Sequence, residues 1–187
     1  MLSFVVLTNK AGLLVLRKLQ KITLDIISIS NEQIERANEL YPFNALKGSI
    51  TKGKSNIYGA LGEILIYDLC IEKGLNVDDK STYDYDLIIE GYTVDVKTKR
   101  TTVIPKPHYL CSISSFNTKQ KCDFYFFVRI NENMKEAYLL GYKAKEKFFN
   151  ESKFAKKGSL DINGWAFKDD GYHLEVSKLN QFNHLLA

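Results

Sequence analysis

Hydrophobic and polar residues follow a helical arrangement in two segments between residues 31 and 74 and mainly a strand-like arrangement after them. Asn31 followed by EQIERANEL predicts a capped, mostly polar helix that ends near Pro42. The segment NIYGALGEILIYDLCIEKG predicts a second, more apolar helix, with Gly74 as its C-terminal stop. We therefore expect two helices ahead of the main strands.

The second half of the chain contains mainly strand patterns. YDLIIEGYTVDVKTKR has alternating β-branched and aromatic residues around Glu90-Gly91, which predicts a β-hairpin. HYLCSI predicts a further strand, CDFYFFVRI a strand buried on both faces, and EAYLLGY its antiparallel neighbour. A short helix, a turn and a strand are expected near residues 144–149, 163–165 and 172–177.

These elements predict one α/β domain over residues 23–187. Residues 1–22 are set apart as an N-terminal extension, either an added strand and helix or a loosely attached segment. No segment approaches the ~18 to 20 apolar residues of a membrane span. The first residues also lack a basic start and a small-residue cleavage site. We expect a cytoplasmic protein.

Composition adds few constraints. The 187 residues are 45% hydrophobic and 26% charged, which is typical of a soluble globular protein. The net charge of +4 permits an anionic partner without requiring one. The three cysteines show no C-x-x-C spacing and favour reduced thiols over disulfides.

Residues 48–55, GSITKGKS, match the phosphate-binding P-loop pattern G-x-x-x-x-G-K-[ST]. A P-loop joins a buried strand to a helix. A helix follows here, but ELYPFNALK ahead of the match contains Pro42 and no β-branched run. A basic loop is the favoured interpretation, and a nucleotide site that uses Lys54 is the weaker alternative.

The register of the predicted hairpin brings charged residues together. With Glu90-Gly91 as a two-residue turn, Asp86 lies opposite Asp95, and Lys97 points to the same face. The other face presents Leu87, Ile89, Tyr92, Val94 and Val96. Opposed carboxylates repel each other unless a cation lies between them, and Mg²⁺ prefers such oxygen ligands. The backbone carbonyl of Val96 offers a further ligand, and Lys97 is placed to orient water or stabilise a phosphate.

A D-x-K triplet alone also fits a surface ion pair. Glu63 supports the metal interpretation, because it lies on the preceding helix directly after two glycines that suggest close approach to the sheet or to a ligand, Gly59 and Gly62. No acidic residue occurs between Val96 and Cys122, so a basic rim around the carboxylates suits a polyanion. The candidate nucleic-acid contacts are Lys54, Lys99, Arg100, Lys106, Tyr109 and Gln120.

Together, Glu63 on a helix, Asp86 at the start of a strand and Asp95-Val96-Lys97 on the next strand resemble the PD-(D/E)XK nuclease superfamily. The resemblance covers roughly residues 45–180. Within the superfamily, this segment is similar to small phage and prokaryotic members. The resemblance implies a restriction-endonuclease-like α/β fold, with a central mixed sheet flanked by helices. Tyr85 precedes Asp86 where the superfamily pattern has proline. Asp84 is a nearby competitor for the metal role.

The resemblance implies a deoxyribonuclease that uses Mg²⁺ or Mn²⁺. Asp86 and Asp95 would hold the metal, Lys97 would be the catalytic lysine, and Glu63 would assist the metal site. DNA is the expected partner, and a homodimer stays open. Two rivals also stay open, a non-catalytic nucleic-acid-binding module of the same fold and a P-loop enzyme that uses residues 48–55.

Overall fold

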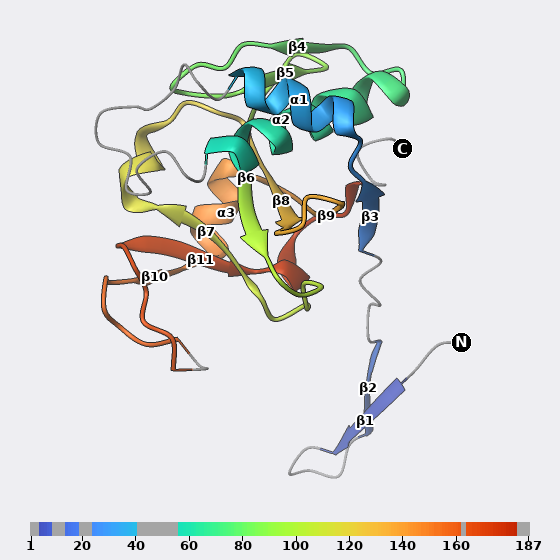
Figure 1. Cartoon of the computed structure of the whole chain (residues 1–187). Coiled ribbons are helices and arrows are strands. Elements are labelled where there is room, and N and C mark those ends of the chain that lie inside the picture. Colours follow the sequence, from blue (N-terminus) through green and yellow to red (C-terminus); the bar gives the residue numbers. More distant parts are fainter. Residues whose placement is uncertain (1–3, 9–13, 19–23, 41–55, 162–163, 183–187) are drawn as a thin grey trace.

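The computed structural model describes residues 4–8, 14–18, 24–40, 56–161 and 164–182. A six-stranded sheet lies at its centre (Figure 1). In spatial order its strands are β3 (Asp25–Ser28), β9 (Glu136–Ala144), β8 (Phe124–Asn131), β6 (Tyr92–Thr101), β5 (Leu87–Ile89) and β4 (Val77–Asp79). β6 and β8 are parallel and the other neighbours are antiparallel, so the sheet is mixed, as expected.

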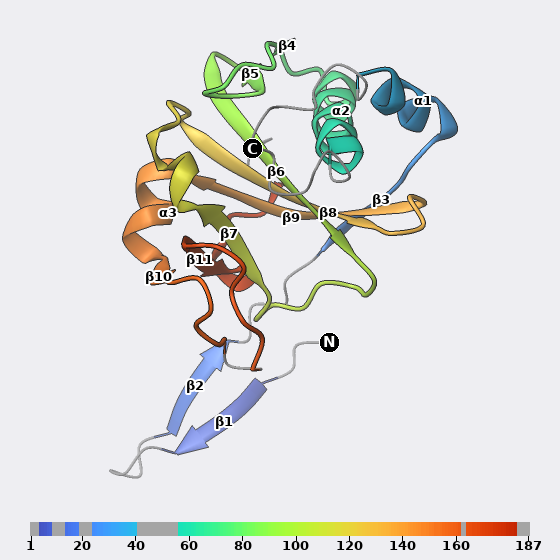
Figure 2. The same cartoon turned by 60° about the vertical axis from the view of Figure 1, so that its left-hand side comes forward.

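Different layers cover the two faces of this sheet (Figure 1 and Figure 2). One face carries the helices α1 (Asn31–Leu40) and α2 (Asn56–Glu72). The other carries the helix α3 (Lys145–Glu151) and a small three-stranded sheet. That sheet has the order β10 (Lys153–Ala155), β11 (Gly171–Glu175) and β7 (Leu110–Ser114). The α/β architecture with helices around a central mixed sheet is confirmed, and the small sheet is an addition to it.

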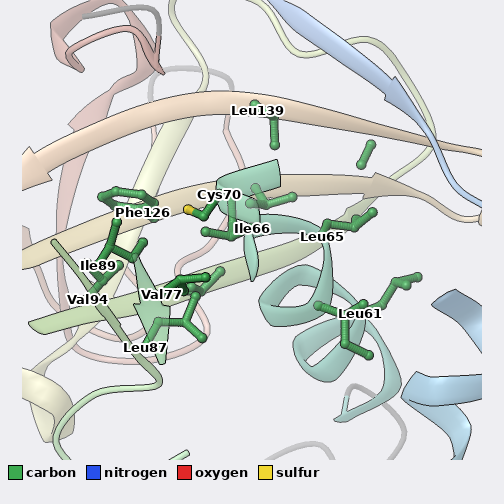
Figure 3. Packing of buried hydrophobic residues seen from close by; sticks show 14 of the residues in the cluster. Leu61, Leu65, Ile66, Cys70, Val77, Leu87, Ile89, Val94, Phe126 and Leu139 are labelled. Atoms are coloured by element: carbon green, nitrogen blue, oxygen red, sulfur yellow. The ribbon is translucent and has the colours of Figure 1, made fainter. Parts of the chain in front are cut away.

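Strand β8 is buried on both faces, as its apolar run predicts. Phe126, Val128 and Ile130 join the core beneath α1 and α2. Tyr125 and Phe127 join a second core with residues of α3, β7 and β11. Figure 3 shows the first core, where side chains of α2 pack against side chains of the sheet. The α2 residues labelled there are Leu61, Leu65, Ile66 and Cys70, and the sheet residues are Val77, Leu87, Ile89, Val94, Phe126 and Leu139.

The predicted hairpin is present, and its three pairs nearest the turn have the predicted register, whereas the pairing does not continue to Asp86 and Asp95. Ile89 pairs with Tyr92, and Leu87 pairs with Val94. The turn residues Glu90 and Gly91 have φ values of 50° and 84°, the left-handed conformation that a two-residue hairpin turn requires. Its apolar face is buried except at Tyr92, which is 58% exposed beside the turn.

The two predicted helices are confirmed, with one correction at a helix start. Asn31 is the first helical residue of α1 and not its cap. The cap is Ser30, whose hydroxyl accepts a hydrogen bond from the Gln33 N–H while the Gln33 side chain accepts one from the Ser30 N–H. α2 ends where expected, because Gly74 has a φ of 73°.

Only one of the two α2 glycines lies against the sheet. A Cβ on Gly62 would meet the Thr98 hydroxyl of β6 at 1.9 Å, which confirms the predicted close approach. A Cβ on Gly59 would meet nothing within 4 Å, so this glycine does not lie against the sheet. The sheet therefore fixes the position of the helix turn that carries Glu63.

The remaining expectations have mixed outcomes. The strands over HYLCSI, CDFYFFVRI and EAYLLGY and the helix near 144–149 are confirmed as β7, β8, β9 and α3. The strand near 172–177 is shorter than expected, because β11 passes into the 3₁₀ helix η3 (Val176–Lys178).

In the extension, β1 (Phe4–Thr8) pairs with β2 (Leu14–Lys18), so the described residues form an antiparallel strand pair. The P-loop match at 48–55 and part of the turn at 163–165 lie outside the described residues. Within the described residues, no helix has the length and apolar character needed to cross a membrane.

Candidate active site

Asp86 lies where β5 and β6 stop pairing. The pairing of the two strands ends at Leu87 and Val94. Beyond it, the Asp86 N–H donates to the Val94 carbonyl at 2.9 Å. The Asp86 side chain then accepts a hydrogen bond from the Val96 N–H at 2.7 Å. The carboxylate accepts the hydrogen bond that a backbone carbonyl would accept if the strands continued to pair, and this bond holds it against β6.

Asp95 is the most buried carboxylate of the site, at 3% exposure. The Lys97 ammonium lies 2.5 Å from its Oδ2. This contact brings the charges together without hydrogen-bond geometry, so Oδ2 is a buried oxygen that accepts no hydrogen bond. Its charge is compensated by the ion pair with Lys97 and not by a hydrogen bond. The site is therefore shaped for a further positive partner at Asp95.

The carboxyl groups of the site repel one another when they are ionised. Burial, and then the nearby charge of Asp95, raises the pKa of Asp86 to about 7, although the Val96 N–H and Lys97 act in the opposite direction. Burial, and then the charges of Asp86, Asp79 and Asp95, raises the pKa of Glu63 to about 8. Lys97 lowers the pKa of both groups and so compensates only part of this negative charge.

Asp79, near the end of β4, is a charge that the sequence patterns miss. It acts on Glu63 more strongly than Asp95 does. Its Oδ1 accepts a hydrogen bond from the Ser81 hydroxyl at 2.9 Å. β4 has only three residues, too few to show a strand pattern, so the antiparallel pairing that places Asp79 opposite Leu87 leaves no local signal.

The donor set fits a hard divalent cation. Mg²⁺ takes oxygen ligands and commonly binds through one or two protein carboxylates. Asp86 and Asp95 supply these, and the Oδ2 of Asp95 accepts no hydrogen bond although it lies in an ion pair with Lys97. Among the described residues, no three His, Cys, Asp or Glu side chains are arranged to hold a metal as they stand. The fit therefore rests on two carboxylates, with Glu63 as an outer acidic group.

Gln120, a predicted nucleic-acid contact, is buried and orients Lys97. It is 7% exposed. Its Oε1 accepts a hydrogen bond from the Lys97 ammonium at 3.3 Å, and its Nε2 donates to the Tyr83 carbonyl at 2.8 Å. Its backbone carbonyl accepts from the Lys145 ammonium. Gln120 is thus a fixed support for the lysine.

The other predicted contacts are spread over the molecule. Lys99 follows Lys97 on the same face of β6, and its ammonium donates to the Ser112 hydroxyl at 3.0 Å. Arg100 points to the opposite face and lies 4.0 Å from Glu132, so it does not join a rim with Lys99. The Tyr109 ring lies beneath the Arg129 guanidinium. Lys106 is exposed in the loop before β7, and Lys54 lies outside the described residues.

Asp84, the neighbouring acidic residue, joins two loops. Its Oδ1 accepts a hydrogen bond from the Lys121 N–H at 3.1 Å, which ties the loop before β5 to the loop before β8. Tyr85 packs against the second hydrophobic core. Both residues therefore have structural roles beside Asp86.

Comparisons with known proteins give a likeness to solved structures. No family model matches the chain, and no curated protein matches it. Among solved structures, it is similar to Hjc of Archaeoglobus fulgidus, a Holliday junction resolvase from an archaeal hyperthermophile. The two share 8% identity over 67% of this chain and 94% of Hjc, with a TM-score of 0.35. Functional assignment therefore depends on the geometry of the site itself.

Proposed function

We propose that this protein is a metal-dependent nuclease that hydrolyses phosphodiester bonds in DNA. One observation supports this most strongly. Asp95 has a buried carboxylate oxygen with no hydrogen bond, beside a second carboxyl at Asp86 and a lysine at 2.5 Å. Excess negative charge in a partly dry site, with a fixed ammonium next to it, suits a divalent cation and a phosphate together.

Each residue has a defined place in this proposal. Asp86 and Asp95 would hold Mg²⁺ or Mn²⁺, with the Val96 carbonyl and Glu63 as further oxygen donors. A bound divalent ion would supply charge neutralisation at the phosphate and activation of a water molecule. Lys97 donates to a phosphate oxygen or orients the attacking water, and Gln120 holds the ammonium in place for that role. The water oxygen bonds to phosphorus as the bond to the 3′ oxygen breaks.

The proposed nuclease domain comprises residues 23–187, with residues 1–22 as an extension. DNA is the proposed partner. Lys97 and Lys99 lie on one face of β6, so the substrate strand would follow this face. Action in the cytoplasm, and as a homodimer where both strands are cut, belongs to the same proposal.

The test is cleavage of supercoiled, linear, single-stranded and branched DNA with Mg²⁺, Mn²⁺ or EDTA. Wild-type protein should cut only with metal, and Asp95→Ala and Lys97→Ala should each lose that activity. Asp78→Asn is the matched control, because this carboxylate is exposed on β4 and pairs with Lys80. Absence of cleavage by the wild type on every substrate, with DNA binding retained, would favour a non-catalytic binding module instead.

A further inference from the structure

A pair of like charges lies further along the strand that carries the candidate active site. Lys99 of β6 is the direct neighbour of Arg129 on the parallel strand β8. Neighbouring strands lie ~4.8 Å apart, so directly paired side chains share a face and are close together. Like charges in this position destabilise a sheet unless something of opposite sign lies between them.

No carboxylate of the described residues compensates this pair by an ion pair. The described ion pairs involve other cations, namely Arg36, Lys80, Lys97, Arg100 and Lys143. Burial, and then the charge of Arg129, lowers the pKa of Lys99. Its side chain nevertheless stays exposed to solvent on one side. The two cations therefore share a local excess of positive charge that an anion can reach.

Neutral groups hold both cations in place. The Lys99 ammonium donates to the Ser112 hydroxyl at 3.0 Å, and that hydroxyl lies 2.8 Å from the His173 Nδ1. Burial lowers the pKa of His173 to about 4, so its ring is neutral near pH 7 and adds no charge. Arg129 donates to the Leu110 carbonyl at 3.1 Å and lies over the Tyr109 ring. These contacts fix the positions of the charges without neutralising them.

The position relative to the active site indicates which anion would bind. Asp95, Lys97 and Lys99 are every second residue of β6, so their side chains point to the same face. Each is ~6.6 Å from the next along the strand. This step is comparable with the separation of successive phosphates along a nucleic-acid strand. Arginine and lysine with a hydroxyl donor are usual phosphate ligands.

We propose that Lys99 and Arg129, with the Ser112 hydroxyl, form a binding subsite for the phosphate next to the one cleaved. The position of this phosphate relative to the cleaved one rests on the proposed function. Binding of a phosphate at the subsite can be measured without cleavage. Arg129 falls within an apolar run, and only the parallel pairing of β6 with β8 brings it beside Lys99.

The first measurement is DNA binding in EDTA over a salt series, with a labelled oligonucleotide in single-stranded and duplex forms. Arg129→Gln should reduce the slope of log affinity against log salt by about 1. It should also weaken binding roughly fivefold to tenfold at low salt. Lys135→Gln is the control, because it removes one positive charge from an exposed turn on the same β8–β9 hairpin.

Two further variants separate charge from folding, since Arg129 also bonds to Leu110. Arg129→Lys should keep the wild-type salt slope, because it keeps the charge. Lys99→Gln should reproduce the lower slope with little effect on thermal unfolding. A purely structural role would instead lower the unfolding temperature of both Arg129 variants and leave every salt slope unchanged, which would overturn the subsite.

The second measurement locates the phosphate. Each phosphate near the cleavage position is replaced in turn by a neutral methylphosphonate, and cleavage is measured with Mg²⁺. Replacement of one adjacent phosphate should slow cleavage by the wild type and have no further effect on cleavage by Arg129→Gln, whereas additive losses would contradict the assignment.

The two measurements together separate the subsite from the nuclease activity. Cleavage by the wild type, with a salt slope that Arg129→Gln leaves unchanged, would overturn the subsite alone. A lowered slope without any wild-type cleavage would overturn the nuclease and keep the phosphate site. Absence of DNA binding would overturn both.

Discussion

Glu63→Gln should stabilise the metal-free protein at alkaline pH, although it removes an acidic group from the proposed active site. Burial, followed by the charges of Asp86, Asp79 and Asp95, raises the pKa of Glu63 from 4.5 to about 8. The folded protein therefore holds this proton more tightly than the unfolded chain does. The corresponding stability is complete below about pH 4.5 and is lost as the pH rises through about 8.

The pKa shift sets the size of the effect. One pKa unit corresponds to about 1.4 kcal/mol, so the full shift gives an upper limit of ~5 kcal/mol. Asp86 titrates in the same cluster and shares part of this repulsion. We therefore expect Glu63→Gln to raise the free energy of unfolding by about 2–4 kcal/mol near pH 9 and by almost nothing near pH 4. For a chain of this size the gain at high pH is roughly a 5–15 °C rise in melting temperature.

Urea unfolding in EDTA at both pH values measures this difference. Glu72→Gln is the matched control, because it removes an exposed glutamate from the last turn of the same helix. A gain that is the same at both pH values would indicate a simple propensity effect. A loss of stability at alkaline pH would refute the account of Glu63 as a buried charge repelled by its neighbours.

Three further predictions concern the same region. Mg²⁺ or Mn²⁺ at a hundred times its dissociation constant should stabilise the wild type by about 2.7 kcal/mol, and thermal unfolding of Asp95→Asn should show no such gain. Gln120→Leu should lower kcat about tenfold with little change in KM, because Lys97 loses its support; partial rescue by Gln120→Glu in steady-state assays would agree, and a change confined to KM would not. Gly62→Ala should cost about 1–3 kcal/mol against Thr98, whereas Gly59→Ala should gain up to about 1 kcal/mol; equal effects in urea unfolding would contradict this packing.

The sequence predicts the hairpin part of the site well because its geometry is local. Glu90-Gly91 specifies a tight turn, and the alternation after it assigns each side chain to a face. Asp86, Asp95 and Lys97 are therefore placed together before any long-range contact is known. The exposed Tyr92 shows the limit of this reasoning, since alternation gives a direction and not the depth of burial.

Residues that depend on long-range pairing are missed or misassigned. Gln120 follows the 3₁₀ helix η2 (Ser115–Lys119), and its contact with Lys97 spans 23 residues of sequence. Its place in a basic segment suggests a contact with nucleic acid. The crossover from β6 to β8 buries its side chain instead. Asp79 requires the pairing of β4 with β5. No local pattern in the sequence encodes either arrangement.

Two unbalanced charge pairs lie in succession along β6, and this order gives the proposed site its direction. Asp86 and Asp95 concentrate negative charge at one point, where Lys97 compensates only part of it. Lys99 and Arg129 concentrate positive charge a short step further along the same face. Each pair costs stability in the isolated protein, and a ligand of opposite charge relieves that cost. A single nucleic-acid strand with a divalent cation at the phosphate cleaved would relieve both at once, with its next phosphate on the basic pair. Binding of metal and of DNA should therefore each tighten the other, because both ligands remove repulsion along one strand.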